Sequence, residues 1–151
     1  MSEAGEVVEH RAAARDAVEF RGHPLVKSTH QTTIEVTAEE YLTEEGECII
    51  GVGASKGCAG LSPDVQAGIR RQGSRVTVRI LAHALSFEVK AWGDPRLRLS
   101  DPRDLVIRRS DFASDRTLAV RADAAARDIP REMVRLLKDP STRGRLEIEV
   151  A

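Results

Sequence analysis

Two stretches of the chain carry side chains that could bind a ligand or transfer a proton. The first, residues 22–33, contains His23, His30, Thr32 and Thr33 around a proline-containing loop. Two histidines in such a loop can ligate a metal ion or act as an acid and base pair. The commoner use of these side chains is to hydrogen-bond the amides of the loop, and we favour that interpretation. A metal site at His23 and His30 is kept only as the lesser alternative.

The second stretch, residues 51–60, is rich in glycine and precedes the start signal of a helix. Glycines let a ligand approach the backbone, and Lys56 with the first amides of the helix would suit an anion. The spacing departs from the known phosphate-binding loops, because no serine or threonine follows the lysine directly and no G-x-G-x-x-G pattern is present. We therefore expect a packing turn, with phosphate or carboxylate binding as the alternative. The candidate residues here are Gly51, Gly53, Lys56 and Gly57.

Comparison of the sequence with itself adds two carboxylates. An ungapped alignment of residues 18–41 with a segment of the second half places Asp94 over His23 and Asp101 over His30. If the halves pack about a twofold axis, each histidine could face an aspartate, which would favour the charged imidazole and fix its tautomer. Capping of loop amides is again the interpretation that we favour.

A third stretch, residues 96–109, holds five arginines with Asp101 and Asp104 among them. Arginines at alternate strand positions could face phosphates, but the interleaved acids favour a solvated surface of weak ion pairs. Trp92 precedes this stretch and is the only tryptophan of the chain, and we expect it to anchor the core, with a ligand lid as the lesser alternative.

The elements that position these residues recur in the same order in both halves. Alternating or β-branched runs predict three strands, then an amphipathic helix, then a fourth strand. In the first half these elements cover residues 18–20, 32–37, 48–54, 62–72 and 75–81. In the second half they cover residues 87–91, 104–108, 117–122, 129–138 and 145–150.

We expect an internal duplication in which two halves, residues 17–82 and 85–151, share one core, since neither alone could bury enough surface. The alignment needs a small insertion before the last strand, so that Val76 lies over Leu146. The predicted fold is α+β and mainly β, with βββαβ halves, about eight strands and two helices in a closed or half-closed, barrel-like core. A ferredoxin-like α/β sandwich is the alternative.

Composition and termini exclude several classes of function. The 23 basic and 24 acidic residues give a formal net charge of −1, which does not support nucleic-acid binding through bulk charge but leaves a local basic patch open. Aromatic residues make up 3%, too few for a stacking platform. Cys48 and Cys58 are expected to be reduced hydrophobes. Residues 1–16 form a polar tail without a signal segment, and no apolar run could span a membrane, which predicts a cytoplasmic protein.

Several long segments have counterparts in a known family. The segment GHPLVKSTHQTTIEVTAEEYLTEEGECIIGVGASKG, with the later WGDP, VIRRSDF and RTLAVRADAAA, resembles an archaeal family catalogued as domain of unknown function 371. The resemblance extends from about residue 17 to the C-terminus and implies an archaeal cytosolic protein, but no reaction or cofactor. Ser55 stands where the family is expected to have an acidic residue. The family motif positions are His23, His30, Thr32, Thr33, Gly51, Lys56, Arg121 and Asp123.

The residues favour a non-enzymatic module that binds an anionic ligand, RNA or a protein partner, because no nucleophile with a base and no paired-carboxylate site stands out. A small, metal-assisted enzyme that uses the loop of His23 and His30 is one alternative. A structural subunit of a larger assembly is the other. The cofactor is left unknown, and a homodimer is allowed.

Overall fold

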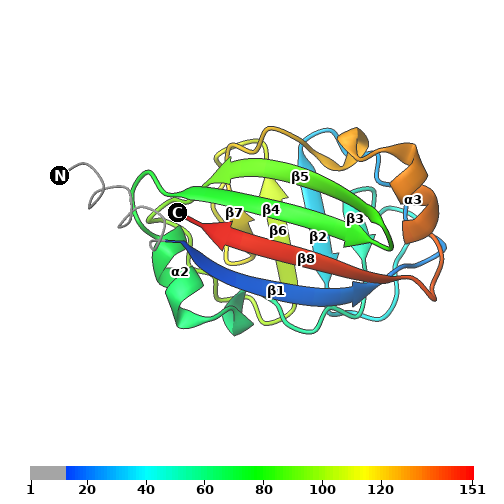
Figure 1. Ribbon diagram of the computed structural model, residues 1–151, viewed down its shortest axis with the longest axis horizontal. Coiled ribbons are helices and arrows are strands. Elements are labelled where there is room, and N and C mark those ends of the chain that lie inside the picture. The colour runs from blue at the N-terminus through cyan, green and yellow to red at the C-terminus, as the bar shows by residue number, and fades with distance from the viewer. Residues whose placement is uncertain (1–12) are drawn as a thin grey trace.

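The computed structural model of the chain describes residues 13–151, which form two packed four-stranded sheets with a short helix at each end (Figure 1). The first sheet is antiparallel throughout and has the order β1-β8-β4-β5. Its strands are β1 (Ala14–Arg21), β4 (Arg75–Ala82), β5 (Leu85–Trp92) and β8 (Arg143–Val150).

The second sheet has the order β3-β2-β6-β7, with an antiparallel central pair and parallel outer pairs. Its strands are β2 (Thr33–Thr37), β3 (Ile49–Gly51), β6 (Asp104–Arg108) and β7 (Thr117–Ala119). The helices are α2 (Pro63–Ile69) and α3 (Arg131–Leu137), preceded by the 3-10 turns η1 (Cys58–Gly60) and η2 (Ala126–Asp128). The prediction of a mainly β, α+β fold with two helices is confirmed.

Local sequence explains where α2 begins and which side it buries. The Ser62 hydroxyl accepts a hydrogen bond from the Val65 amide at 3.3 Å, and Pro63 occupies the first turn, where a missing amide proton is not needed. Val65 and Ile69, one turn apart, are fully buried. Helix α2 therefore packs one apolar stripe against the core and ends at the edge of the first sheet.

The core lies between the inner faces of the two sheets. Val18 and Ile80 enter it from the first sheet, and Ile34 and Ile107 enter it from the second, each with at most 1% of its surface exposed. The strands of the front sheet run across those of the rear sheet in Figure 1. Burial on alternate residues of β4 and β8 matches the alternation that predicted these strands.

The order and lengths of the elements repeat along the chain. Each half has strands of 8, 5 and 3 residues, a 3-10 turn of 3, a helix of 7 and a last strand of 8. The central pair of the first sheet keeps its register when the halves are exchanged, since Val76 faces Val150 and Ala82 faces Gly144.

The insertion that the alignment placed before the last strand is wrong. Strand β8 begins at Arg143 and matches β4 end to end, so Gly144, not Leu146, corresponds to Val76. The alignment matched apolar side chains and therefore missed Gly144, which faces the core although it has no side chain. A Cβ atom there would overlap the ring of Phe20, so the ring of Phe20 fills the space that a side chain would take.

The closed barrel that the prediction allowed is not formed. The two sheets meet at each edge through a single bridge, Arg21 with Val52 and Trp92 with Val120. Strands β3 and β7 are too short to continue these bridges into full ladders. The ferredoxin-like alternative also fails, because the strands are divided between two sheets.

Strand β1 begins at Ala14, inside the stretch predicted as a polar tail, and the rest of that stretch, residues 1–12, lies outside the described residues. No helix within residues 13–151 is both long and apolar enough to cross a membrane.

Candidate functional site

The histidines of the first candidate loop accept hydrogen bonds from backbone amides. His23 Nδ1 accepts from the Leu25 amide at 3.1 Å, and His30 Nδ1 accepts from the Thr32 amide at 3.2 Å. The Thr32 hydroxyl lies 3.2 Å from the hydroxyl of the buried Thr33, so His30 and both threonines share one turn. Nδ1 atoms that accept amide protons in this way are engaged in holding the loop. In the part of the chain that the structure describes, no cluster of three or more His, Cys, Asp or Glu side chains is placed to hold a metal ion.

Asp94 and Asp101 cap amides in the same way as the histidines to which they align. Asp94 Oδ1 accepts from the Arg96 amide at 2.9 Å, and Asp101 Oδ1 accepts from the Arg103 amide at 2.8 Å. These are contacts of Asx turns, in which a carboxylate bonds the amide two residues on.

The facing His–Asp pairs that the alignment allowed are not formed. The His23 amide donates to a carbonyl at the end of α3, whereas the Asp94 amide donates to a carbonyl at the end of α2. These helices lie at opposite ends of the molecule (Figure 1). His30 and Asp101 are separated likewise, because the first contacts η2 and the second contacts η1. Strands β1 and β5 run in opposite directions across the sheet and deliver the two loops to opposite ends.

The lysine of the glycine-rich stretch, considered there as an alternative anion site, is paired with a carboxylate of the chain itself. Asp16 Oδ1 lies 3.0 Å from Lys56 Nζ, and Asp16 Oδ2 accepts from the Ser62 amide at 2.8 Å. Burial alone would raise the pKa of Asp16, but the hydrogen bonds from Ser62, Lys56 and Ala17 outweigh it and lower the pKa. Lys56 and the start of α2 are therefore already neutralised by an internal carboxylate.

The glycines of that stretch are required by close packing. A Cβ atom at Gly51 would overlap the ring of Phe20, and one at Gly57 would lie 2.5 Å from the Arg103 amide nitrogen. Gly53 has a left-handed φ of 61°, which disfavours other residues. The packing interpretation accounts for all three positions without a ligand.

Replacement of Asp16 by Asn is expected to lower the free energy of unfolding at pH 7 by about 1–3 kcal/mol, because charged hydrogen bonds would be weakened. The pKa is lower in the folded chain, so this stabilisation is present above the unfolded value near 4 and is lost as the pH falls through the folded value. Urea unfolding of both proteins between pH 7 and pH 2 measures the difference, which should shrink in acid. Asp64→Asn, on the exposed side of α2, serves as the control, and a difference independent of pH would contradict the account.

A groove at the edge of the first sheet collects basic side chains around the tryptophan. Its volume is about 190 Å³, and β4, β5 and the turn after β7 form its walls. The Arg75 guanidinium lies over the Trp92 ring, 4.1 Å from the ring centre. We call this cavity the basic groove and define it by the residues Arg75, Lys90, Trp92, Arg121 and Asp123.

Carboxylates of residues 13–151 neutralise the positive charge of the basic groove only in part. Asp123 joins the turn after β7 to β5 through two hydrogen bonds. Its Oδ1 accepts from the Lys90 amide at 3.0 Å, and its own amide donates to the Lys90 carbonyl at 2.9 Å. Lys90 Nζ is 3.9 Å from a Glu88 oxygen on the outer face of the sheet. Across residues 13–151, no carboxylate, including that of the last residue, lies within 4.0 Å of the guanidinium nitrogens of Arg75 or Arg121.

Arg121 adopts an unfavourable backbone conformation. Its φ is 51°, in the left-handed region, and the matching residue of the first half is Gly53. A residue with a Cβ atom pays about 1 kcal/mol there relative to glycine. Ser28, His83 and Leu99 share this left-handed conformation, and Arg121 is the one of the four that lines the basic groove.

Three of the residues predicted from the sequence lie together here. Arg121 and Asp123 line the basic groove, and Asp94 is close enough for the charge of Arg121 to act on it. Hydrogen bonds from Arg96 lower the pKa of Asp94, and the charges of Arg96 and then Arg121 lower it further. Sequence reasoning missed Arg75 and Lys90 as partners, because only the pairing of β4 with β5 brings them beside one another.

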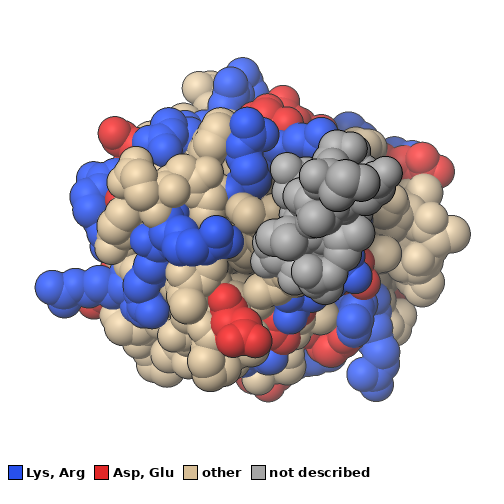
Figure 2. Space-filling model, turned by 60° about the vertical axis from the view of Figure 1, so that its left-hand side comes forward, with Lys and Arg blue, Asp and Glu red and all other residues tan. Residues whose placement is uncertain are grey.

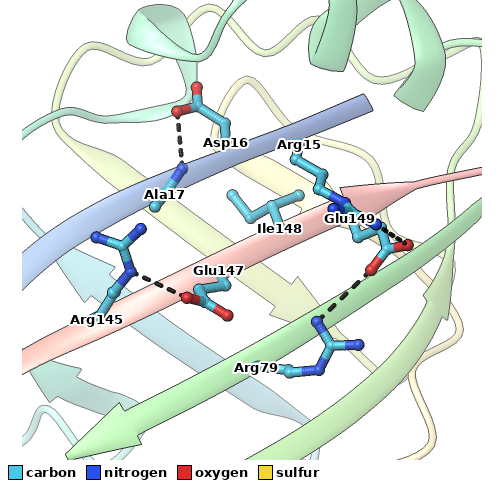
Figure 3. A pocket seen from close by; sticks show the side chains of 8 residues that line it. All are labelled: Arg15, Asp16, Ala17, Arg79, Arg145, Glu147, Ile148 and Glu149. Carbon is cyan, nitrogen blue, oxygen red and sulfur yellow. Dashed lines mark hydrogen bonds and ion pairs between the residues drawn. The ribbon is translucent and has the colours of Figure 1, made fainter. Parts of the chain in front are cut away.

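A hollow of about 600 Å³ lies on the outer face of the first sheet, and its charges pair with one another. Arg15 and Arg79 each place a nitrogen 3.6 Å from Glu149, and Arg145 Nε lies 3.0 Å from Glu147 (Figure 3). Opposite charges from three neighbouring strands thus satisfy one another, which leaves this surface less suited to an anion than the basic groove.

A buried polar cluster on the outer face of the second sheet was not predicted. Glu35 is 5% exposed, and its Oε2 lies 3.3 Å from Arg116 Nη1, which also reaches Asp104 Oδ2 at 3.1 Å. The Cys48 thiol donates to Glu35 Oε1 at 3.5 Å. Burial raises the pKa of Glu35 despite the charge of Arg116. The cluster fastens the loops that precede β3 and β7 onto β2 and β6.

Both thiols are expected to react slowly in the folded protein. Burial raises the pKa of Cys48 and that of Cys58 to about 12, so little thiolate is present at pH 8. Reaction with a disulfide reagent at pH 8 should be about 1,000-fold slower than that of an exposed cysteine and should become fast in denaturant. Stopped-flow absorbance measures this, and rapid labelling of either thiol in buffer would contradict the burial.

The chain is similar to known proteins over most of its length. A family model described as "Domain of unknown function (DUF371)" matches residues 18–151. An uncharacterized protein of Methanocaldococcus jannaschii is 37% identical over 122 residues, which is 81% of this chain and 90% of the relative. The family resemblance drawn from the sequence motifs is confirmed. The match includes every residue of the basic groove and begins after Asp16.

Proposed function

The chain belongs to the family described as domain of unknown function 371, and from the geometry of its basic groove we propose that it is a cytoplasmic module that binds a phosphate-bearing anion without transforming it. The observation that carries this proposal is the set of Arg75, Lys90 and Arg121 around Trp92, with both guanidinium groups lacking a carboxylate of the described chain within 4.0 Å. Guanidinium groups hydrogen-bond phosphate oxygens through paired donors, which makes them suited to this ligand.

The size and chemistry of the basic groove favour binding over catalysis. A volume of about 190 Å³ fits one or two phosphate groups and is below the range typical of sites for drug-sized molecules. The single acid, Asp123, uses an oxygen on the Lys90 amide and so supports the wall of the groove. A proton-transfer role would need a side chain free to gain or lose a proton next to the ligand.

We also propose that the chain is one domain of two pseudo-symmetric halves, residues 17–82 and 85–151, that arose by duplication and share one half-closed, barrel-like core. Equal element lengths and the exchangeable register of β4 and β8 support this. So do Ser28 and Leu99, which occupy matching turns and have the same φ of 54°. The halves then differ at the basic groove, where the second half has Arg121 and the first half has Gly53 at the matching position.

Titration with inorganic pyrophosphate at constant ionic strength tests the proposed function. The thermal midpoint should rise with ligand concentration, as mass action requires, whereas sodium chloride should have no such effect. Arg75→Ala should reduce the rise, because it removes a ligand contact. Arg143→Ala, at the matching position of the other half, should leave it intact. A midpoint that does not respond to pyrophosphate would refute the proposed function.

A further inference from the structure

Arginine side chains continue beyond the basic groove toward the end of α2. The Arg70 guanidinium donates to the Leu97 carbonyl at 3.0 Å and also to the Arg98 carbonyl, which fastens the loop after β5 to the helix end. The Gly93 amide donates to Ser74, so the start of β4 joins the same surface. We call this surface the arginine end and define it by the arginines that follow α2, begin β4, follow β5 and follow β7, namely Arg70, Arg71, Arg75, Arg96, Arg98 and Arg121.

Within the described residues, most guanidinium groups of the arginine end have no carboxylate partner. Arg96 is held by Asp94 at 3.0 Å. For Arg71 and Arg98, no carboxylate between residues 13 and 151 approaches within 4.0 Å. Figure 2 turns this end of the molecule forward and shows Lys and Arg side chains spread widely over it, with fewer acids between them. The chain as a whole is close to neutral, so this concentration of cations is local.

A single phosphate in the basic groove would leave Arg71 and Arg98 unused, since neither lines that cavity. A ligand with phosphates in series could contact the groove first and then the helix end. We infer that the ligand is a chain of phosphate groups, such as the backbone of a nucleic acid, which enters the basic groove at one point and follows the arginine end. This inference rests on the proposed function and adds the length of the ligand to it.

The recognition would depend on charge and would carry little sequence specificity. Guanidinium contacts to backbone phosphates release counterions, so the affinity falls steeply with salt. The one indole of the arginine end already has Arg75 over its ring, which leaves no row of aromatic rings for successive bases. We expect binding of mixed RNA sequences with similar affinity.

The test compares a short ligand with two long ones. Fluorescence anisotropy of a labelled mixed-sequence RNA 20-mer, and its competition by inorganic polyphosphate, report on the chain of phosphates, and calorimetry with pyrophosphate reports on the basic groove. The double variant Arg71→Ala/Arg98→Ala should weaken RNA binding about 10-fold or more and reduce the slope of log affinity against log salt by about 1–2. It should leave pyrophosphate affinity unchanged. Arg135→Ala/Arg143→Ala removes the same charge at the α3 end and should change neither.

Each outcome separates this inference from the proposed function. RNA or polyphosphate bound with the dependence on Arg71 and Arg98 supports a chain of phosphates, and the competition shows which of the two is preferred. Pyrophosphate bound with no gain in affinity for either long ligand overturns the inference and leaves the proposed function standing. The inference is also overturned if Arg135→Ala/Arg143→Ala weakens RNA binding as much as Arg71→Ala/Arg98→Ala does. Binding would then depend on the total charge of the protein and not on the arginine end. Absence of pyrophosphate binding refutes the proposed function itself.

Discussion

Replacement of Gly93 by Ala is expected to lower the free energy of unfolding by about 3 kcal/mol or more. A Cβ atom at this position would overlap both the carbonyl oxygen of Ile69 and the hydroxyl of Ser74. The Gly93 amide also donates to the Ser74 carbonyl at 3.0 Å, and the next amide donates to Ile69 at 2.9 Å. A displaced backbone would break the junction between β5 and the end of α2.

Equilibrium unfolding in urea measures this effect against two further variants. Gly22→Ala should destabilise the protein comparably, because the matching Cβ atom would lie 2.6 Å from the Leu137 carbonyl oxygen at the end of α3. Gly73→Ala should lower the free energy of unfolding by only about 1 kcal/mol, because nothing lies within 4 Å of its Cβ position and only the left-handed φ is unfavourable. Equal effects at Gly73 and Gly93 would mean that the close packing is absent.

Replacement of Arg121 by Gly is expected to separate stability from binding. Glycine relieves the left-handed φ of 51°, so the free energy of unfolding should rise by about 1 kcal/mol or stay unchanged. The same variant removes a guanidinium from the basic groove, and a charged hydrogen bond to phosphate contributes about 1.5–3 kcal/mol. Pyrophosphate affinity should therefore fall about 10- to 100-fold in a protein that is no less stable.

Calorimetry and urea unfolding of the same preparations provide both readouts. Arg121→Lys keeps the charge and should retain part of the affinity, which distinguishes loss of charge from loss of paired donors. A variant Arg121→Gly that binds as well as the native chain would show that the strained arginine serves another purpose. One that is strongly destabilised would show that its side chain is needed for packing.

The order of elements could be predicted because each one is specified locally. The alternation along Arg75–Ala82 predicts a strand with one buried face, and the run of β-branched residues at Thr33–Thr37 predicts another. The signals Ser62 and Pro63 place the start of α2. Strand ends were less predictable, since β8 begins at two residues, Arg143 and Gly144, that carry no apolar side chain.

The candidate site could be predicted only in part. Arg121 and Asp123 belong to a recognisable motif, but the cavity they line also requires Arg75 and Lys90 from a hairpin earlier in the chain. That meeting depends on the bridge between Trp92 and Val120, which no local pattern specifies. Anion binding by Lys56 was only the alternative to a packing turn, and the carboxylate that Lys56 contacts belongs to Asp16. Asp16, which supplies that anion, lay in a stretch predicted to be a tail.

The intrinsic fluorescence of Trp92 tests the central claim most directly, because it is the only tryptophan of the chain and lines the basic groove. Titration of the native protein with pyrophosphate should produce a saturable change in emission, since a bound anion would alter the charge beside the ring and the position of Arg75 over it. The change should be lost in Arg121→Gly and kept in Arg143→Ala. Emission that stays constant while calorimetry records binding would place the anion elsewhere and contradict the account.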